Sequence, residues 1–404
     1  MKNIFFKNLF WNSMGQFTNL VIPLIGFPIL VRKLGLQSYG EMIIHLLIWQ
    51  SVCMILDYNY NSLGVQKVLA CDGNERRIVS LNLFLSKIYL FSLGIIIFLL
   101  ASVFYFYNEE KLFIVFGIAY LFGYLMTNQM WFSVNEKFYL LAFINFISKF
   151  VFLIGIFAFI SDLRSVLMIQ ALSLLISGFL SVFITKYPRE FSISDTMYRD
   201  GFLFLKETYP AFSANFSGYI LSNVPLYLGP MLLSPSNFGI YSLIDRIVRV
   251  FLAVYSAINQ VLFRKTLSMV LLGISQLREY ILRILVLIVP LYILICGFGI
   301  LVSIYVSPLL FHVNLKNYLP YFVQLSAWSI FSVVNSILGY HYLQSLQKYR
   351  EYGNIMAVSL ILTILFTYLF GKLYAIGGMV SGMVLSEVII LFILLHIYVT
   401  KRGI

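Results

Sequence analysis

The residues of this sequence that could do chemistry are a few charged side chains inside long apolar runs. Lys149, Arg246 and Glu387 lie near the middle of such runs, and Asp57 lies towards the end of another. A charged residue at the centre of a bilayer costs about 2.5–3.5 kcal/mol on insertion scales, so it usually faces a cavity or a pathway. There a basic group can hold an anion, and a carboxylate can bind and release a proton or Na⁺. The predicted chemistry is therefore the binding and release of charged ligands.

A second pattern pairs an acid with a base. Asp245 and Arg249 stand four residues apart, so on a helix they lie on one face and can form an ion pair. This pair has two open interpretations, a structural contact or part of a binding site, and the adjacent Arg246 would be a separate cation. Asp57 could likewise pair near the membrane surface, and Lys87 could extend its ammonium group to that surface.

Polar stripes cross two of the apolar runs. Asn215 and Ser222 lie on one face of a helix with Tyr219 between them, and four amides share one face of the first run. These four are Asn8, Asn12, Gln16 and Asn19. Such stripes can join helices by hydrogen bonds. Their position in the first run of each half of the chain also fits a water-filled cavity.

The elements that must position these residues are membrane helices. Apolar types make up 61% of the 404 residues and charged types 11%, whereas a soluble domain is about 25% charged. A membrane helix takes about 20 residues, and the runs are too long and too evenly apolar for barrel strands. The sequence therefore predicts an all-α integral membrane protein with twelve transmembrane helices, at 9–31, 41–64, 81–104, 112–134, 138–160, 165–185, 209–232, 239–262, 281–304, 319–342, 353–371 and 375–398.

The basic residues predict how these helices are oriented. Most of the 28 Lys and Arg residues fall in alternate segments, and those segments include both termini. Because cytoplasmic loops carry an excess of Lys and Arg, both termini are predicted to be cytoplasmic. The net charge of +12 is explained by this bias, and the sequence has no nucleic-acid motif.

An internal repeat predicts the domain organisation. Leu34–Gly40 and Leu233–Gly239 share Leu, an aromatic residue and Gly in register, and each precedes the second helix of its half. Six helices in each half give both halves the same orientation, which is a parallel repeat. The predicted domains are an N-terminal six-helix lobe at 1–186, a cytoplasmic connecting loop at 187–208 and a C-terminal six-helix lobe at 209–404.

Several kinds of enzyme site are missing from the sequence. It has no phosphate-binding loop for ATP hydrolysis, and its His and Cys residues show no metal-ligand spacing. The predicted outer loops are short. The sequence therefore predicts a transporter with no cofactor and no metal, in preference to an enzyme.

Four short segments, in order, resemble one family of membrane transporters. Pro28–Gly40 is similar to the family's loop between its first two helices. Asp57–Asn61 is similar to its aspartate–aromatic–Gly–aromatic–Asn stretch, with Asn59 in place of the glycine. Trp131–Phe132 resembles a Trp-Phe-Phe-Gln-Gly element without its Gln-Gly pair, and Tyr374–Glu387 resembles the start of helix twelve. The family is the polysaccharide-transporter branch of the multidrug/oligosaccharidyl-lipid/polysaccharide (MOP) exporter superfamily, and the chain looks most like the O-antigen flippases of the Wzx type.

The resemblance implies a fold, a substrate and a location. Two parallel six-helix lobes would surround a central cavity, as in the MOP/MATE-like fold, in the bacterial inner (cytoplasmic) membrane. The substrate would be an undecaprenyl-pyrophosphate-linked O-antigen or polysaccharide repeat unit, moved from the inner to the outer leaflet by alternating access. Besides this lipid-linked oligosaccharide and the membrane lipids, its partners would be a polysaccharide polymerase and a chain-length regulator. Nucleic acid would not be a partner.

This substrate suggests a role for each candidate residue. Lys149, Arg246 and Arg249 would hold the pyrophosphate, since a guanidinium group binds phosphate through two hydrogen bonds. The sugars would be bound by amide side chains, namely those of Asn12, Gln16, Asn19 and Asn215. Asp57, Asp245 and Glu387 would bind a coupling proton or Na⁺.

Two other functions stay open on the sequence. A cation-coupled multidrug antiporter has the same fold, although its substrates are often cationic and should favour acidic cavity groups. An integral-membrane polysaccharide polymerase or ligase would act on the same lipid-linked sugars, but that class usually has sizeable outer loops. A capsule or teichoic-acid exporter is a neighbouring interpretation that the sequence does not separate from an O-antigen flippase.

Overall fold

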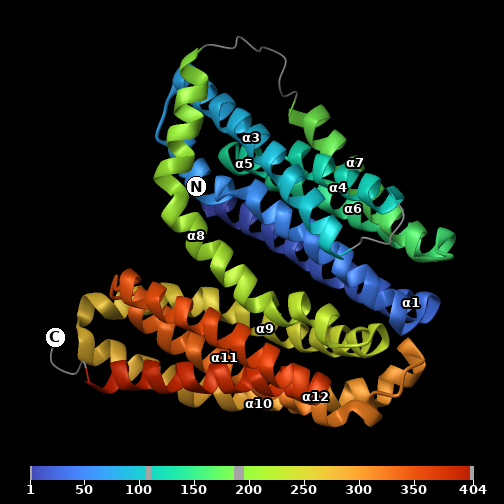
Figure 1. The fold of residues 1–404 in the computed structure, drawn as a ribbon. Coiled ribbons are helices and arrows are strands. Elements are labelled where there is room, and N and C mark those ends of the chain that lie inside the picture. Colours follow the sequence, from blue (N-terminus) through green and yellow to red (C-terminus); the bar gives the residue numbers. More distant parts are fainter. Residues whose placement is uncertain (1, 106–110, 186–194, 401–404) are drawn as a thin grey trace. The chain divides into compact units, whose positions relative to one another are not determined.

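The computed structural model describes residues 2–105, 111–185 and 195–400, and every regular element in these ranges is a helix (Figure 1). The chain forms two compact units, unit 1 at Met1–Phe216 and unit 2 at Ser217–Ile404. Within the described ranges, eight helical stretches are long and apolar enough to cross a membrane. The twelve predicted spans lie on these eight stretches and on two further long helices. Two of these ten contain two spans each. The predicted all-α membrane fold is confirmed.

Unit 1 consists of helices that pack side by side. Helix α4 packs on α7, α1 on α6, and α6 on α7 (Figure 1). The elements are α1 (Lys2–Asp57), the π-helical turn η1 (Tyr60–Gly64), α2 (Val65–Leu69), α3 (Gly73–Tyr105), α4 (Lys111–Met126), α5 (Gln129–Val134), α6 (Phe138–Phe159), α7 (Leu163–Thr185) and the first part of α8 (Asp195–Leu232).

Unit 2 is built in the same way. Helix α9 packs on α10 and α11, and α11 packs on α12. The elements are the rest of α8, α9 (Pro235–Leu272), α10 (Ile274–Phe311), the 3₁₀ turn η2 (Leu315–Tyr318), α11 (Leu319–Ser336), the π-helical turn η3 (Ile337–Gln344) and α12 (Tyr349–Thr400).

The two repeated motifs mark the junction between the first and second spans of each unit. Gly35 interrupts α1 with φ 74° and ψ 169°, a backbone conformation that glycine adopts readily. In unit 2 the junction is a break before α9, where Ser234 caps the helix by accepting a hydrogen bond from the amide of Asn237 and Pro235 occupies the first turn. A straight α1 of 56 residues would be about 84 Å long, far more than the roughly 30 Å hydrocarbon core. The interruption at Gly35 divides it into two spans.

Helix α12 contains the last two predicted spans, folded as an antiparallel hairpin. Its backbone is non-helical only at Tyr374 and Ala375, where the φ of Ala375 is 49°. After this bend, Gly382 lies so close to the first half that an added Cβ would meet the carbonyl of Phe366 at 2.5 Å. Gly378 and Gly382, four residues apart, allow this close helix packing.

Helix α8 differs from its prediction. The sequence predicts a connecting loop over 187–208, whereas the described part of that segment is helical from Asp195 onward. The reason is burial of aromatic side chains within unit 1. Phe204 is buried and stacks on Tyr60 with ring centroids 5.5 Å apart, and Phe212 stacks on Tyr58 at 4.2 Å. An amphipathic segment with such a face forms a helix rather than a loop.

Candidate functional site

A tight turn at the end of α1 positions the first candidate, Asp57. Tyr58 and Asn59 both have positive φ, 33° and 63°, and η1 follows directly. Asparagine is one of the few residues other than glycine that tolerate this left-handed conformation. The turn therefore forms with Asn59 in place of the family's glycine, and the amide of Asn59 accepts a hydrogen bond of 2.7 Å from Asn215 Nδ2.

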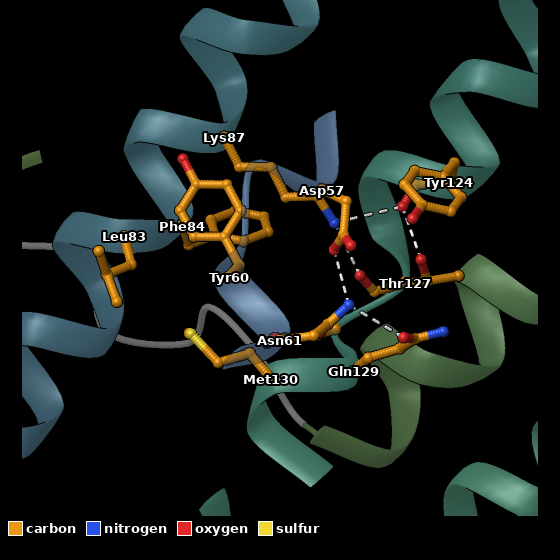
Figure 2. Close-up of a pocket in the computed structure, with 11 residues that line it drawn as sticks. Asp57, Tyr60, Asn61, Leu83, Phe84, Lys87, Tyr124, Thr127, Gln129 and Met130 are labelled. Carbon is orange, nitrogen blue, oxygen red and sulfur yellow. Dashed lines mark hydrogen bonds between the residues drawn. The ribbon is translucent and has the colours of Figure 1, made fainter. Parts of the chain in front are cut away.

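Asp57 lines a small polar cavity of about 20 Å³ in unit 1, between α1, α3 and the α4–α5 junction. Figure 2 shows Asn61 donating to both the Asp57 carboxylate, at 2.6 Å, and Gln129 Oε1, at 3.1 Å. Such a volume holds about one water molecule. Lys87 also lines this cavity, and its Nζ donates to the carbonyl oxygen of Thr127 at 2.9 Å. This arrangement binds the end of α4 to α3 and can hold a small ion or water, but not a sugar.

Unit 2 contains a larger cavity, of about 240 Å³. It lies among α8, α9, α11 and α12, and its walls combine apolar side chains with a few polar ones. The polar lining residues are Ser222, Arg249, Ser332, Asn335, Ser336, Tyr352, Ser359, Thr363 and Glu387. A cavity with one cation, one acid and several neutral hydrogen-bonding groups suits an anionic, hydroxyl-rich ligand better than an apolar one.

Arg249 is held in place by two bonds, one of them to the partner that the sequence predicts. Its Nε donates to Asp245 Oδ2 at 2.6 Å and one Nη donates to the carbonyl oxygen of Ser222 at 2.7 Å. The side chain of Asp245 is 4% exposed and that of Arg249 is 30% exposed. A guanidinium group has five N–H donors, so these two bonds leave the other donors for groups in the cavity. The pair can thus be both a structural contact and an anion-binding group.

Glu387 lies in the same cavity and has a partner that the sequence analysis missed. Asn335 Nδ2 donates both to Glu387 Oε2 at 2.6 Å and to the Glu387 carbonyl oxygen at 2.9 Å. Ser332 and Trp328 also lie within hydrogen-bonding reach of the carboxylate. A signal was present, because Ser329, Ser332 and Ser336 form a polar stripe on α11 beside Asn335.

The other predicted site residues are spread more widely. Lys149 on α6 and Arg246 on α9 are half-buried and have partners of their own, and neither is among the lining residues of the two cavities described above. Asn215 lies in unit 1 with Asn59, although the sequence groups it with Ser222 of unit 2. The side chains of Asn12, Gln16 and Asn19 lie outside the described part of α1. In the described ranges no three His, Cys, Asp or Glu residues gather to hold a metal ion.

The comparisons with known proteins agree with this arrangement. A family described as polysaccharide biosynthesis protein matches residues 5–263, which is more than half of the chain. The protein belongs to this family. None of the curated protein sequences matches it.

Solved structures share the fold at low sequence identity. The lipid II flippase MurJ, in an inward closed conformation, matches with a TM-score of 0.71 and 14% identity, over 99% of this chain and 88% of MurJ. A multidrug resistance MATE family transporter of the MOP superfamily matches in its inward-facing conformation with a TM-score of 0.62 and 14% identity, over 95% of this chain and 96% of the transporter. An outward-facing MATE structure matches with a TM-score of 0.59 and 14% identity, over 98% and 95%. This member of the polysaccharide biosynthesis family therefore has a MOP-type transporter fold.

Proposed function

We propose that this protein is a flippase that moves an undecaprenyl-pyrophosphate-linked oligosaccharide, an O-antigen or related polysaccharide repeat unit, from the inner to the outer leaflet. The observation that carries the proposal is membership of the polysaccharide biosynthesis family by a chain with the fold of a lipid II flippase. A transporter of lipid-linked sugars combines both. The protein is then not an enzyme, and it acts beside the polymerase and chain-length regulator that use its product.

The charges of the unit 2 cavity support an anionic head group. Arg249 is fixed by Asp245 and Ser222, so it offers a preorganised cation to a pyrophosphate. Arg246, on the same helix, and Lys149, on α6, are the further basic residues assigned to this anion. Hydroxyl and amide groups on α11 and α12 offer hydrogen bonds to sugars, as the amides of Asn12, Gln16, Asn19 and Asn215 would do in unit 1.

Movement of the head group would occur by alternating access. The chain shares its fold with MATE structures in both inward-facing and outward-facing conformations, so the fold is compatible with both states. Asp57, Asp245 and Glu387 are the acids assigned to a coupling proton or Na⁺. Each elementary charge that crosses 100 mV supplies about 2.3 kcal/mol, which is enough to drive a substantial concentration ratio.

Deletion of the gene tests the function directly. A flippase mutant accumulates lipid-linked units on the inner leaflet of the cytoplasmic membrane, whereas loss of a polymerase or ligase accumulates them on the outer leaflet. Accumulation on the outer leaflet would refute the proposal. For the orientation, a reporter fused after Asn74 should be cytoplasmic and one fused after Asn108 should be outside; the opposite result would reverse the topology.

Substitutions test the anion-binding residues separately from the function. We expect Lys149→Ala and Arg246→Ala to reduce surface polysaccharide at matched expression, and Lys149→Arg and Arg246→Lys to keep more of it. Lys316→Ala is the matched control, because Lys316 is an exposed cation on η2. Normal surface polysaccharide in both alanine variants would remove these residues from the site without removing the flippase function.

A multidrug antiporter is the second candidate, because two MATE structures share the fold. The cation in the unit 2 cavity favours an anionic ligand over the cationic substrates of that class. Increased drug susceptibility of the deletion strain, with normal surface polysaccharide, would favour the antiporter.

A further inference from the structure

A buried histidine in unit 2 lies outside every role described so far. His341 is fully buried in η3, the π-helical turn after α11. A π-helical turn inserts an extra residue into a helix, is uncommon, and is found frequently at functional sites. Here it places the imidazole ring against α9, where the Phe263 ring packs on it with centroids 5.8 Å apart.

Both ring nitrogens of His341 have hydrogen-bond partners on α9. Nδ1 lies 2.8 Å from the hydroxyl of Thr266, and Nε2 lies 2.6 Å from Oδ1 of Asn259. The same amide oxygen accepts from the Tyr255 hydroxyl at 3.0 Å, and that hydroxyl lies 3.3 Å from Ser336 Oγ. Ser336 lines the unit 2 cavity. A continuous chain of polar contacts therefore runs from a buried ring to the cavity.

The hydrogens of this chain depend on the charge of His341. When the Thr266 hydroxyl donates its hydrogen to the carbonyl of Leu262, 3.0 Å away, it accepts from His341, and Nδ1 carries a hydrogen. Nε2 faces an amide oxygen, which is an acceptor only. A charged ring, with a hydrogen on each nitrogen, fits this arrangement.

Loss of one proton to water reverses the chain. In a neutral ring that keeps its hydrogen on Nδ1, Nε2 is bare, and the Asn259 amide turns to offer its NH₂ group to the ring. The turned NH₂ group also donates to the Tyr255 oxygen. Tyr255 must then direct its own hydrogen towards Ser336 instead of Asn259. The charge of His341 thus sets the hydrogen-bond direction at the wall of the cavity.

Among the described side chains, few ionisable groups surround the ring to compete with this behaviour. Tyr255 on α9 and Tyr340 on η3 are nearest, the latter with ring centroids 5.7 Å apart. Around the rest of η3 the described ionisable groups are Tyr352 and Tyr398 of α12, Tyr342 of η3 itself, and Arg278 of α10, which donates to the Tyr342 hydroxyl. Histidine is the side chain whose charge changes most readily near physiological pH.

We propose that His341 is a proton-binding site and that Asn259, Tyr255 and Ser336 relay its charge state to the unit 2 cavity. The proton comes from water and returns to it, so no further reactant is needed. The site is additional to the carboxylates assigned to coupling above, and it does not depend on the identity of the transported substrate.

The test uses the full-length protein in lipid bilayers, with no substrate present. The protein has four histidines, so ¹⁵N labelling of the imidazole rings gives four NMR signals. His341→Gln identifies the signal of His341 by its loss. We expect that signal to change from a neutral ring to an imidazolium within the range in which protein histidines titrate, about pH 4 to pH 8. If His341→Gln does not fold, glutamine substitutions of His45, His312 and His396 assign the signal by elimination.

The relay has its own readout. The protein is labelled with ¹³C-tyrosine, and Tyr255→Phe assigns the Tyr255 signal. In the wild type, the chemical shift of Tyr255 should change with pH at the same midpoint as that of His341. In His341→Gln it should not depend on pH. His396→Gln is the matched control, because His396 is an exposed histidine of α12, and it should leave both titrations unchanged. A His341 ring that keeps one protonation state over the whole range overturns the proton site. A Tyr255 shift that persists in His341→Gln overturns the relay.

Discussion

Separating Asp245 from Arg249 should destabilise unit 2 far more than separating a similar pair at the surface. The Arg249 Nε and Asp245 Oδ2 atoms are 2.6 Å apart, and the Asp245 side chain is 4% exposed. At an effective dielectric constant of about 20, Coulomb's law gives an attraction of about 6 kcal/mol at that distance. Part of this offsets the loss of hydration of both groups. Asp245→Ala, which leaves a half-buried cation without its acid, should lower the free energy of unfolding by about 3–5 kcal/mol.

The chain provides a matched control of the same chemistry. Arg283 and Glu279 on α10 are also four residues apart, with Nη and Oε1 2.5 Å apart, but their side chains are 70% and 64% exposed. Exposed helical pairs of this kind couple by only about 0.3–0.5 kcal/mol. The two pairs thus have nearly the same N–O distance and the same spacing in the sequence, and they differ in how exposed their side chains are.

The measurement is a double-mutant cycle on each pair. Unfolding free energies are obtained for the two single alanine variants and the double variant by denaturant titration in mixed micelles, and the coupling energy is the deviation from additivity. We expect a coupling energy several-fold larger for Asp245–Arg249 than for Glu279–Arg283. Equal coupling energies in the two cycles would show that burial does not strengthen the pair, and Arg249 would then lose its role as a preorganised cation.

Three further predictions concern other parts of the two units. Asn335→Leu removes the two hydrogen bonds that Asn335 Nδ2 donates to Glu387 and should lower stability by about 1.5–3 kcal/mol, the typical contribution of a hydrogen bond to a charged group, measured by the same titration. Gly382→Ala should lower the melting temperature, because the new methyl group meets backbone of the same hairpin and overpacking typically costs about 1–3 kcal/mol. Asn59→Gly and Asn59→Val both lose the hydrogen bond from Asn215, and the valine variant should be less stable than the glycine variant by about 1–2 kcal/mol because of its left-handed backbone.

Each of these has an internal control. Asn317→Leu makes the same change at an exposed position of η2 and should have little effect. Gly353→Ala adds the same methyl group to the same helix where nothing lies within 4 Å, so it should be neutral or stabilising. A Gly382→Ala protein as stable as Gly353→Ala would contradict the packing of the α12 hairpin. Equal stability of the two Asn59 variants would contradict the turn.

How much of the site could be predicted depends on how far apart its partners lie along the chain. The Asp245–Arg249 contact follows from helical spacing alone, and the i+4 position of Asn61 relative to Asp57 could have been predicted in the same way. Glu387 and Asn335 are 52 residues apart, and Asn61 and Gln129 are 68 apart. Their contacts depend on which helices pack together and with what rotation, which hydropathy does not determine. The identity of the buried acids was therefore predictable, and most of their partners were not.

The fold shows the same division. Helix positions follow from composition, so the predicted spans at 138–160 and 165–185 agree closely with α6 and α7. The helical start of α8 depends instead on aromatic contacts with Tyr58 and Tyr60, which lie far away in sequence. The π-helical turns η1 and η3 likewise have no hydropathy signal. Both π-helical turns carry polar groups described above: η1 contains Asn61, which donates to Asp57, and η3 contains His341.

The α12 hairpin has a consequence for how the protein enters the membrane. Its two halves meet through Gly382 and through a 2.9 Å hydrogen bond between Thr363 and Ser386, across a bend of two residues. The loop to be closed is short, so little chain entropy is lost on closing it. The last two spans can therefore pair with each other as soon as both have left the ribosome, before they meet the rest of unit 2. Glu387 would then enter the bilayer already next to a partner helix, and the hairpin would be the unit of insertion for the end of the chain.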